Sequence, residues 1–388
     1  MDSVEKLTPM IGLIPVLRAE GSGRKNFDVN LLDPATIRWA IRAGLGPLIN
    51  HIHRDRFSQI SDPASRDALR SADLAAKLVM ADMLEALEEI LAASADMASE
   101  IILLKGISVC QYLYPEPHLR SMGDIDLLIP KHSQHKLETL LLDLGYRQQS
   151  SRPAEFYETH HHSMPFFHPT KHQWIEVHTA LLSNENVASD RIFSARHVES
   201  QVVPLLFHGY KTNRLSYEQE MVYIAAHWAF ERKCFVGGLI PLVDMMYLIQ
   251  KHGDEIDWDR LLPLLDASQT AVYLNLMLRF LQKFNIVQLP HKLMARIAST
   301  QKYPLGVSEI ILHDLIENYS MRGKQPGRIA TEANLDLLWE TLLRPYPAWL
   351  NLLSASWSIL SVPKNPRRFS PSFQLARIAR MLGWRKQL

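Results

Sequence analysis

Two aspartates stand close together in a stretch that otherwise has the composition of a buried β-strand. The segment "LRSMGDIDLLIP" (119–130) places Asp124 and Asp126 two residues apart. Alternate side chains of a strand share one face, so we expect both carboxylates to point the same way. Carboxylates are seldom buried without a partner, and two on one face repel each other. A divalent cation offsets that repulsion, and Mg²⁺ is a hard cation that binds carboxylate, phosphate and water oxygens.

A third acidic side chain repeats the pattern further along the chain. Glu176 lies in "WIEVH" between two apolar residues, Ile175 and Val177. In a strand, Glu176 faces away from those neighbours, as the two aspartates do from theirs. We therefore expect Glu176 to complete a Mg²⁺ site on a neighbouring strand.

The segment "LLKGIS" (103–108) has the residue types that hold a phosphate. Gly106 permits a close approach to the backbone, and a helix that begins there would direct its free N–H groups toward an anion. Ser108 adds a hydroxyl, and Lys105 and Arg120 add positive charge on either side of the acidic strand. These residues predict a phosphate-bearing ligand beside the metal.

A compact mixed unit of strands and helices must position these groups. Gly145 is expected to end an amphipathic helix that Ser133 begins as its N-cap. The expected elements are strands at 100–106, 124–130, 155–169 and 172–182, a helix at 106–114 and a helix at 133–146.

The flanking regions have helical patterns. Asp33 and Asp62 each precede a proline and a helical run, which is typical of an N-cap followed by proline at the first helical position. The second run predicts a long amphipathic helix over 61–94. Ser216 and Gln219 form a capping-box pattern at the start of another helix. Further helices are expected at 237–253, 269–284, 307–320 and 334–345.

Consecutive histidines, His160, His161 and His162, suggest a metal site of another kind. Consecutive residues of a strand face opposite ways, so three in a row cannot converge on one ion. His160 and His162 share a face and are candidates to line the pocket. His178 lies two residues beyond Glu176 on the same face and is the histidine expected nearest to the acidic site.

The composition excludes several classes of protein. The chain has 388 residues, 47% of them hydrophobic, and a formal net charge of +1, which does not favour a long nucleic-acid partner. Cys110 and Cys234 are far apart and form no zinc knuckle or disulfide framework. The N-terminus lacks the apolar core of a secretory signal, so a cytoplasmic protein is expected.

The C-terminal residues 364–388 carry seven Lys or Arg and no acid, after an uncharged, aromatic-containing run at 345–363. Three readings stay open for this tail: a solvated helix, contact with RNA or another polyanion, and peripheral contact with an anionic membrane. The first is favoured. The oligomeric state is open.

The motifs together resemble the polymerase-β-like nucleotidyltransferase superfamily. More closely, "LLKG", "YPEPHLRSMGDIDLLIP", "LGY" and "IEVH" look like uncharacterised bacterial nucleotidyltransferases that read LKG, R-x-x-G-D-[IM]-D and E-x-H. The resemblance implies an α+β fold, with a small mixed-sheet core at 100–180 between helical regions at 1–99 and 181–388. It also relates His227 and Asp244 to the helical segment of that group.

The resemblance implies roles for particular residues. Asp124, Asp126 and Glu176 would bind two Mg²⁺ ions, with Mn²⁺ as an alternative, and Glu176 would help to activate a hydroxyl. Gly106 and Ser108 match the glycine-serine turn that grips a triphosphate, although the superfamily prefers two glycines there. Lys105, Arg120 and Gly123 flank that turn and the acidic motif, and are assigned to nucleotide binding.

The implied reaction moves a nucleoside monophosphate from an NTP, such as ATP, to an acceptor hydroxyl and releases pyrophosphate. The acceptor is a small molecule, a peptide or an RNA end. One alternative is a non-catalytic module on the same fold that binds a nucleotide or a partner. Another is a metal-dependent hydrolase built on the histidine strand. Three converging carboxylates favour the enzyme over the binding module.

Overall fold

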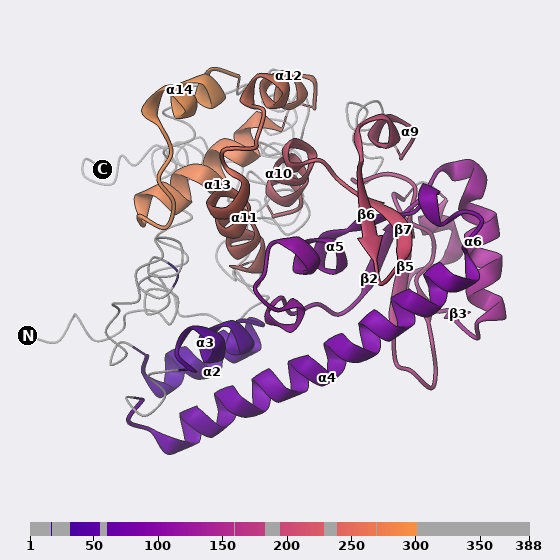
Figure 1. Cartoon of the computed structure of the whole chain (residues 1–388), viewed down its shortest axis with the longest axis horizontal. Helices are drawn as coiled ribbons and strands as arrows, with labels where there is room; N and C mark the ends of the chain where they lie inside the picture. Colours follow the sequence, from indigo (N-terminus) through magenta and orange to yellow (C-terminus); the bar gives the residue numbers. More distant parts are fainter. Residues whose placement is uncertain are drawn as a thin grey trace, which may run out of the picture.

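The fold was obtained as a computed structural model of the whole chain (Figure 1). The structure describes residue 17 and residues 32–54, 60–158, 160–182, 195–228, 239–268 and 270–300. Helices surround one mixed β-sheet, which confirms the expected α+β fold.

From residue 32 onward, three described helices precede the sheet, and the N-termini of the first and third follow the sequence signals. They are α2 (Pro34–Arg42), α3 (Gly46–Ile52) and α4 (Pro63–Ala93). The Asp33 carboxylate accepts a hydrogen bond from the Thr36 backbone N–H at 2.6 Å, and the Asp62 carboxylate accepts one from the Ser65 N–H at 3.0 Å. Both expected caps are therefore confirmed. Helix α4 has 31 residues and runs along the sheet from α2 and α3 toward α6 (Figure 1).

Among the described residues, seven strands form the sheet in the order β3-β4-β5-β2-β1-β7-β6. Strand β2 is antiparallel to β1 and parallel to β5. Strands β6 and β7 form a hairpin beyond residue 180, and β7 pairs in parallel with β1. The strands are β1 (Ile102–Leu104), β2 (Ile125–Leu128), β3 (Arg147–Gln148), β4 (Phe166–Phe167), β5 (Trp174–His178), β6 (Val203–Phe207) and β7 (Tyr210–Arg214).

The two faces of the sheet pack into different apolar cores. Ile125 and Leu127 of β2, with Val177 of β5, pack against the second half of α4 and against α6 (Lys131–Asp143). Leu104 and Leu128 point the other way, into the core that the remaining helices share. The alternation expected for the acidic strand is therefore present, and its polar positions face the helical region.

The remaining helices form a group on that second face (Figure 1). Ser216 and Gln219 make the expected capping box at the start of α10. Helix α5 lies between this group and the sheet. The group consists of α10 (Tyr217–Ala226), α11 (Leu239–His252), α12 (Trp258–Ser268), α13 (Ala271–Lys283) and α14 (His291–Thr300). The other described α-helices are α5 (Lys105–Tyr112) and two short ones, α7 (Ala154–Tyr157) and α9 (Ala195–Val198).

One expected helix start is wrong, and another differs by a single residue. Helix α6 begins at Lys131 after Pro130, so Ser133 lies inside its first turn and donates its hydroxyl to the Glu100 carboxylate instead of capping the helix. Its expected end is confirmed, because Gly145 follows with a φ of 93°. Helix α5 begins one residue before Gly106, at Lys105.

The expected strand over 155–169 is present only near its C-terminal end. Residues 154–157 form α7, the backbone bends at His160 and His161, and only an isolated bridge joins His162 to His178. Strand β4 is limited to two residues, Phe166 and Phe167.

Several expectations lie outside the described residues: the helices at 307–320 and 334–345, the uncharged run at 345–363 and the basic tail at 364–388. Within the part of the chain that the structure describes, no helix combines the length and the apolar character needed to cross a membrane.

Candidate metal and nucleotide site

The acidic residues meet because of the register between two parallel strands. Asp126 of β2 is paired with Glu176 of β5, and Leu128 is paired with His178. Paired residues of neighbouring strands share a face, so Asp126, Glu176 and His178 all lie on the face turned toward the helices. This register brings the three side chains together, although Asp126 and Glu176 are fifty residues apart in the sequence.

Short polar contacts join the side chains on this face. The Lys105 ammonium lies 2.8 Å from Oδ1 of Asp126, and Nε2 of His178 lies 2.8 Å from the same oxygen. Nε2 of His178 is also 3.4 Å from Oε2 of Glu176, and the Lys105 ammonium is 4.0 Å from it. Asp126 is only 2% exposed, so its charge is shielded from water.

The charges of this cluster balance one another. Burial opposes ionisation of Asp126, but the Lys105 ammonium and His178 outweigh it and hold the pKa of Asp126 below its usual range. Burial likewise opposes ionisation of Glu176, yet the hydrogen bond from His178 leaves its pKa lowered. Burial and Lys105 disfavour the His178 imidazolium, but its bonds to Asp126 and Glu176 leave the pKa of His178 raised.

Asp124 lies one residue before β2 and titrates differently from Asp126. The negative charge of Asp126, together with burial, raises the pKa of Asp124 to about 6. Repulsion between two neighbouring carboxylates is the physical origin of such a shift, and a divalent cation would relieve it.

Lys105 reaches the acidic strand from an unusual backbone conformation. It follows the last residue of β1 and has a φ of 50°, in the left-handed region. This conformation costs a residue with a Cβ about 1–2 kcal/mol. Residues held this way cluster at functional sites, and the conformation places the lysine at the junction of β1 and α5.

One of two groups of ligand atoms in the described residues is suited to a hard cation. It consists of Asp126, Glu176 and His178, whose ligand atoms lie within 4.8 Å of one another. Two carboxylates dominate its donor set, which fits Mg²⁺ or Mn²⁺. In the described residues, Nδ1 of His178 is buried without a hydrogen-bond partner. Asp124 is not part of this group, although it interacts electrostatically with it.

The residues assigned to nucleotide binding are placed in different environments. Gly106 is buried, and a Cβ at this position would lie 2.8 Å from Nη1 of Arg120 and 2.9 Å from Cβ of Met122. Ser108 is fully buried in α5, and its hydroxyl has no hydrogen-bond partner in the described residues. Gly123 is exposed, and no atom lies within 4 Å of its Cβ position.

Arg120 is engaged with a partner that the sequence analysis did not give it. Nη2 of Arg120 donates to Oδ2 of Asp244 at 2.9 Å, and its Nε donates to Oδ1 at 3.3 Å. The Tyr114 hydroxyl donates to the same Oδ1 at 2.6 Å. Arg120 and Asp244 both belong to segments that carry the family resemblance, which is the signal that could have suggested the pair.

The consecutive histidines lie together, which corrects the expectation that they diverge. The ring centroids of His160, His161 and His162 are 4.2–4.8 Å apart, and their ligand nitrogens lie within 4.8 Å of one another. The bends at His160 and His161 remove the alternation of a strand. Burial lowers the pKa of all three, that of His160 to about 4.

This histidine cluster borders the acidic site. Nε2 of His162 lies 3.8 Å from Oε2 of Glu176, and the rings of His161 and His162 each lie 5.2 Å from that of His178. His160 and His162 were expected near the pocket, whereas His161 was not.

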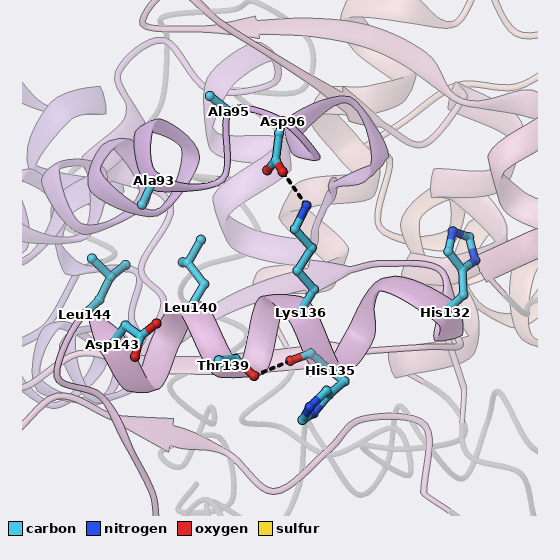
Figure 2. Close-up of a pocket in the computed structure, with 10 residues that line it drawn as sticks. All are labelled: Ala93, Ala95, Asp96, His132, His135, Lys136, Thr139, Leu140, Asp143 and Leu144. Carbon is cyan, nitrogen blue, oxygen red and sulfur yellow. Dashed lines mark hydrogen bonds and ion pairs between the residues drawn. The ribbon is translucent and has the colours of Figure 1, made fainter.

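A surface hollow of about 920 Å³ lies elsewhere, between the end of α4 and helix α6 (Figure 2). Lys136 and Asp96 form an ion pair across it. None of the acidic-site residues or the consecutive histidines lines this hollow.

One comparison with known proteins gives a match. The family described as uncharacterised nucleotidyltransferases matches residues 33–285, which is more than half of the chain and includes the whole acidic site. No curated protein and no solved structure matches the chain.

Proposed function

Since this chain belongs to the family of uncharacterised nucleotidyltransferases, we propose that it transfers a nucleoside monophosphate from an NTP to an acceptor hydroxyl with release of pyrophosphate. One observation carries the proposal. Asp126 and Glu176 stand side by side on parallel strands, with ligand atoms of both and of His178 within 4.8 Å. Nucleotidyl transfer needs such a site, because positioning and neutralisation of phosphate charge supply most of the catalysis.

Asp126 and Glu176, with Asp124 beside them, would hold the divalent metal. Mg²⁺ is the expected ion, in two copies, and Mn²⁺ is a substitute. When bound, the metal would neutralise charge that develops on the attacking hydroxyl oxygen and on the phosphate oxygens of the leaving group. The pKa of Asp124, which the charge of Asp126 raises, supports this assignment, because a divalent cation would relieve the repulsion between the two carboxylates.

Glu176 would also receive the proton of the acceptor. The acceptor oxygen forms a bond to the α-phosphorus while the bond from the α-phosphorus to the bridging oxygen breaks, and pyrophosphate leaves with that electron pair. The released proton moves to Oε2 of Glu176. His178, 3.4 Å from this oxygen, would orient the carboxylate.

The triphosphate would lie at the junction of β1, α5 and the loop before β2. Lys105 stands at the end of β1 with its ammonium in the acidic cluster, where it would contact phosphate oxygens when the metal is bound. Gly106, Ser108, Arg120 and Gly123 surround this junction, and their contacts with the nucleotide stay a prediction. Arg120 would act by holding the loop in place, since its guanidinium is paired with Asp244.

The test supplies each NTP, labelled in its α-phosphate, with Mg²⁺ or Mn²⁺ and an extract of small molecules, peptides and RNA. Asp126→Asn removes one ligand charge, and Asp143→Asn serves as the matched control, because Asp143 is exposed on α6. We expect the wild type and Asp143→Asn to move label to an acceptor and Asp126→Asn to lose at least about 100-fold in rate, as for the loss of one transition-state-stabilising group.

Two outcomes would overturn the proposal. Binding of an NTP with Mg²⁺ but no transfer to any acceptor would identify a non-catalytic binding module. Release of free nucleotide without transfer, supported by Zn²⁺ or Mn²⁺, would identify a hydrolase.

A further inference from the structure

We propose that His160, His161 and His162 form a second metal site, which binds one borderline transition ion of the Zn²⁺ class and lies beside the carboxylate site. The proposal concerns binding, so it does not depend on the transfer reaction.

The positions of the three rings are the first observation. Their ligand nitrogens lie within 4.8 Å of one another. Three nitrogens on a tetrahedral zinc ion are about 3.3 Å apart, given Zn–N distances of about 2.0–2.1 Å. Each nitrogen would therefore need to move inward by no more than about 1 Å, which a small rotation about a side-chain bond achieves.

The donor set is the second observation. Imidazole nitrogens suit Zn²⁺, Co²⁺, Ni²⁺ and Cu²⁺, whereas Mg²⁺ prefers oxygen ligands. The two neighbouring groups therefore differ in the metal that they select: nitrogen atoms of His160, His161 and His162 form one, and carboxylate oxygens of Asp126 and Glu176 dominate the other. In a mixture of Mg²⁺ with a trace of Zn²⁺, we therefore expect Zn²⁺ to bind the histidine nitrogens and Mg²⁺ to bind the carboxylates.

The local backbone explains how consecutive residues serve one ion. Bends at His160 and His161 replace strand geometry, and the bridge from His162 to His178 fixes the end of the segment against β5. The Phe156 ring lies 4.7 Å from the His160 ring, and the Tyr157 ring lies 5.7 Å from that of His162. Side chains of helix α7 therefore pack against the His160 and His162 rings on one side.

A bound ion would join the bent segment to the edge of the acidic site. Because Nε2 of His162 is 3.8 Å from Oε2 of Glu176, the ion would fix the segment next to the carboxylate proposed to accept the acceptor's proton. The site has three protein nitrogens, which leaves a coordination position for water, for Glu176 or for a group of the acceptor.

The experiment titrates the metal-stripped, full-length protein with Co²⁺ in excess Mg²⁺ and follows the visible absorption of nitrogen-coordinated Co²⁺. His160→Gln removes the half-buried ligand, and Asp126→Asn tests the carboxylate site. His132→Gln is the matched control, because its side chain is 77% exposed on α6. Zn²⁺ is then added to displace the Co²⁺.

We expect the wild type, Asp126→Asn and His132→Gln to bind one Co²⁺ with the same spectrum, and Zn²⁺ to displace it. His160→Gln should lose at least about tenfold in affinity, the lower end of the effect of removing a group that only supports a metal ligand. Unchanged binding by His160→Gln, or binding lost in Asp126→Asn but kept in His160→Gln, would overturn the proposal.

A second measurement keeps the test valid if a variant does not fold. The histidines of the wild type are modified with an acylating reagent with and without Zn²⁺ in excess Mg²⁺, and the modified peptides are identified by mass spectrometry. Protection of the peptide with His160–His162 supports the site. Equal modification with and without Zn²⁺ contradicts it, and His132 reports whether the reagent remained active.

Discussion

The ion pair between Arg120 and Asp244 should be a main connection between the acidic-site loop and the helices. Arg120 precedes β2, and Asp244 lies in the middle of α11. Their side chains are 13% and 3% exposed, and two hydrogen bonds of 2.9 and 3.3 Å join them. Loss of either partner leaves a buried charge uncompensated, which typically costs about 3–5 kcal/mol. We therefore expect Asp244→Leu and Arg120→Met each to lower the free energy of unfolding by that amount.

The double variant Arg120→Met/Asp244→Leu should lose much less than the sum of the single losses. It contains no unpaired charge, and its main deficit is the Tyr114 hydroxyl, which loses its acceptor at 2.6 Å. An orphaned buried hydroxyl costs about 1–3 kcal/mol. The double-mutant cycle should therefore give a coupling of about 3 kcal/mol or more.

Urea unfolding followed by circular dichroism measures this coupling. Asp67→Asn is the control, because it breaks an Arg–Asp pair whose side chains, Arg70 and Asp67, are 64% and 75% exposed. That change should alter stability by less than about 0.5 kcal/mol. The reasoning is refuted if the Arg120 and Asp244 losses add to within about 0.5 kcal/mol, which is the behaviour of independent sites.

Three further predictions concern stability. Burial, with the charge of Asp244, raises the pKa of Glu220 from 4.5 to about 8, so the folded state resists its ionisation. The stability that neutral Glu220 contributes is fully present below pH 4.5 and is lost as the pH rises through 8. The free energy of unfolding of the wild type should fall by up to about 5 kcal/mol across this window. A Glu220→Gln variant whose free energy of unfolding falls as steeply with pH would contradict this. Gly106→Ala should destabilise the fold by about 1–3 kcal/mol, because its Cβ would lie 2.8 Å from Nη1 of Arg120. Thermal unfolding measures this loss. Gly123→Ala is the control, because the space around its Cβ position is open and it should show none of this packing penalty. Asp62→Ala removes the cap of α4 and should cost about 1 kcal/mol in urea unfolding, and an unchanged midpoint would mean that water replaces the cap.

The parts of the site that local periodicity governs could be predicted from the sequence. Alternation along "DIDLL" and "WIEVH" placed Asp126, Glu176 and His178 on one face, because apolar neighbours must fill the opposite core. The helix caps at Asp33 and Asp62 could also be predicted from the sequence, because each requires only a short polar side chain before a proline.

The remaining features could not be predicted from the sequence, because they depend on the tertiary structure or on an irregular local backbone conformation. Arg120 and Asp244 are 124 residues apart, and no periodicity relates them. The left-handed conformation of Lys105 and the bends at His160 and His161 break the regular patterns on which the expectations were based. Ser133 is a common capping residue type, but Pro130 ends the preceding segment and the helix starts directly after it. The roles of the individual site residues stay predictions.

The contact between Lys105 and Asp126 means that the acidic site carries its own counterion. Where structural zinc holds a small domain together, the apoprotein unfolds because its ligands have no other partner. Here a lysine and a histidine already compensate the charge of the buried carboxylates, so we expect the fold to persist without a divalent ion. A divalent ion that enters must compete with charges that the protein itself supplies. At the proposed metal site, such competition would favour an ion that binds and leaves with the nucleotide over one that is held permanently.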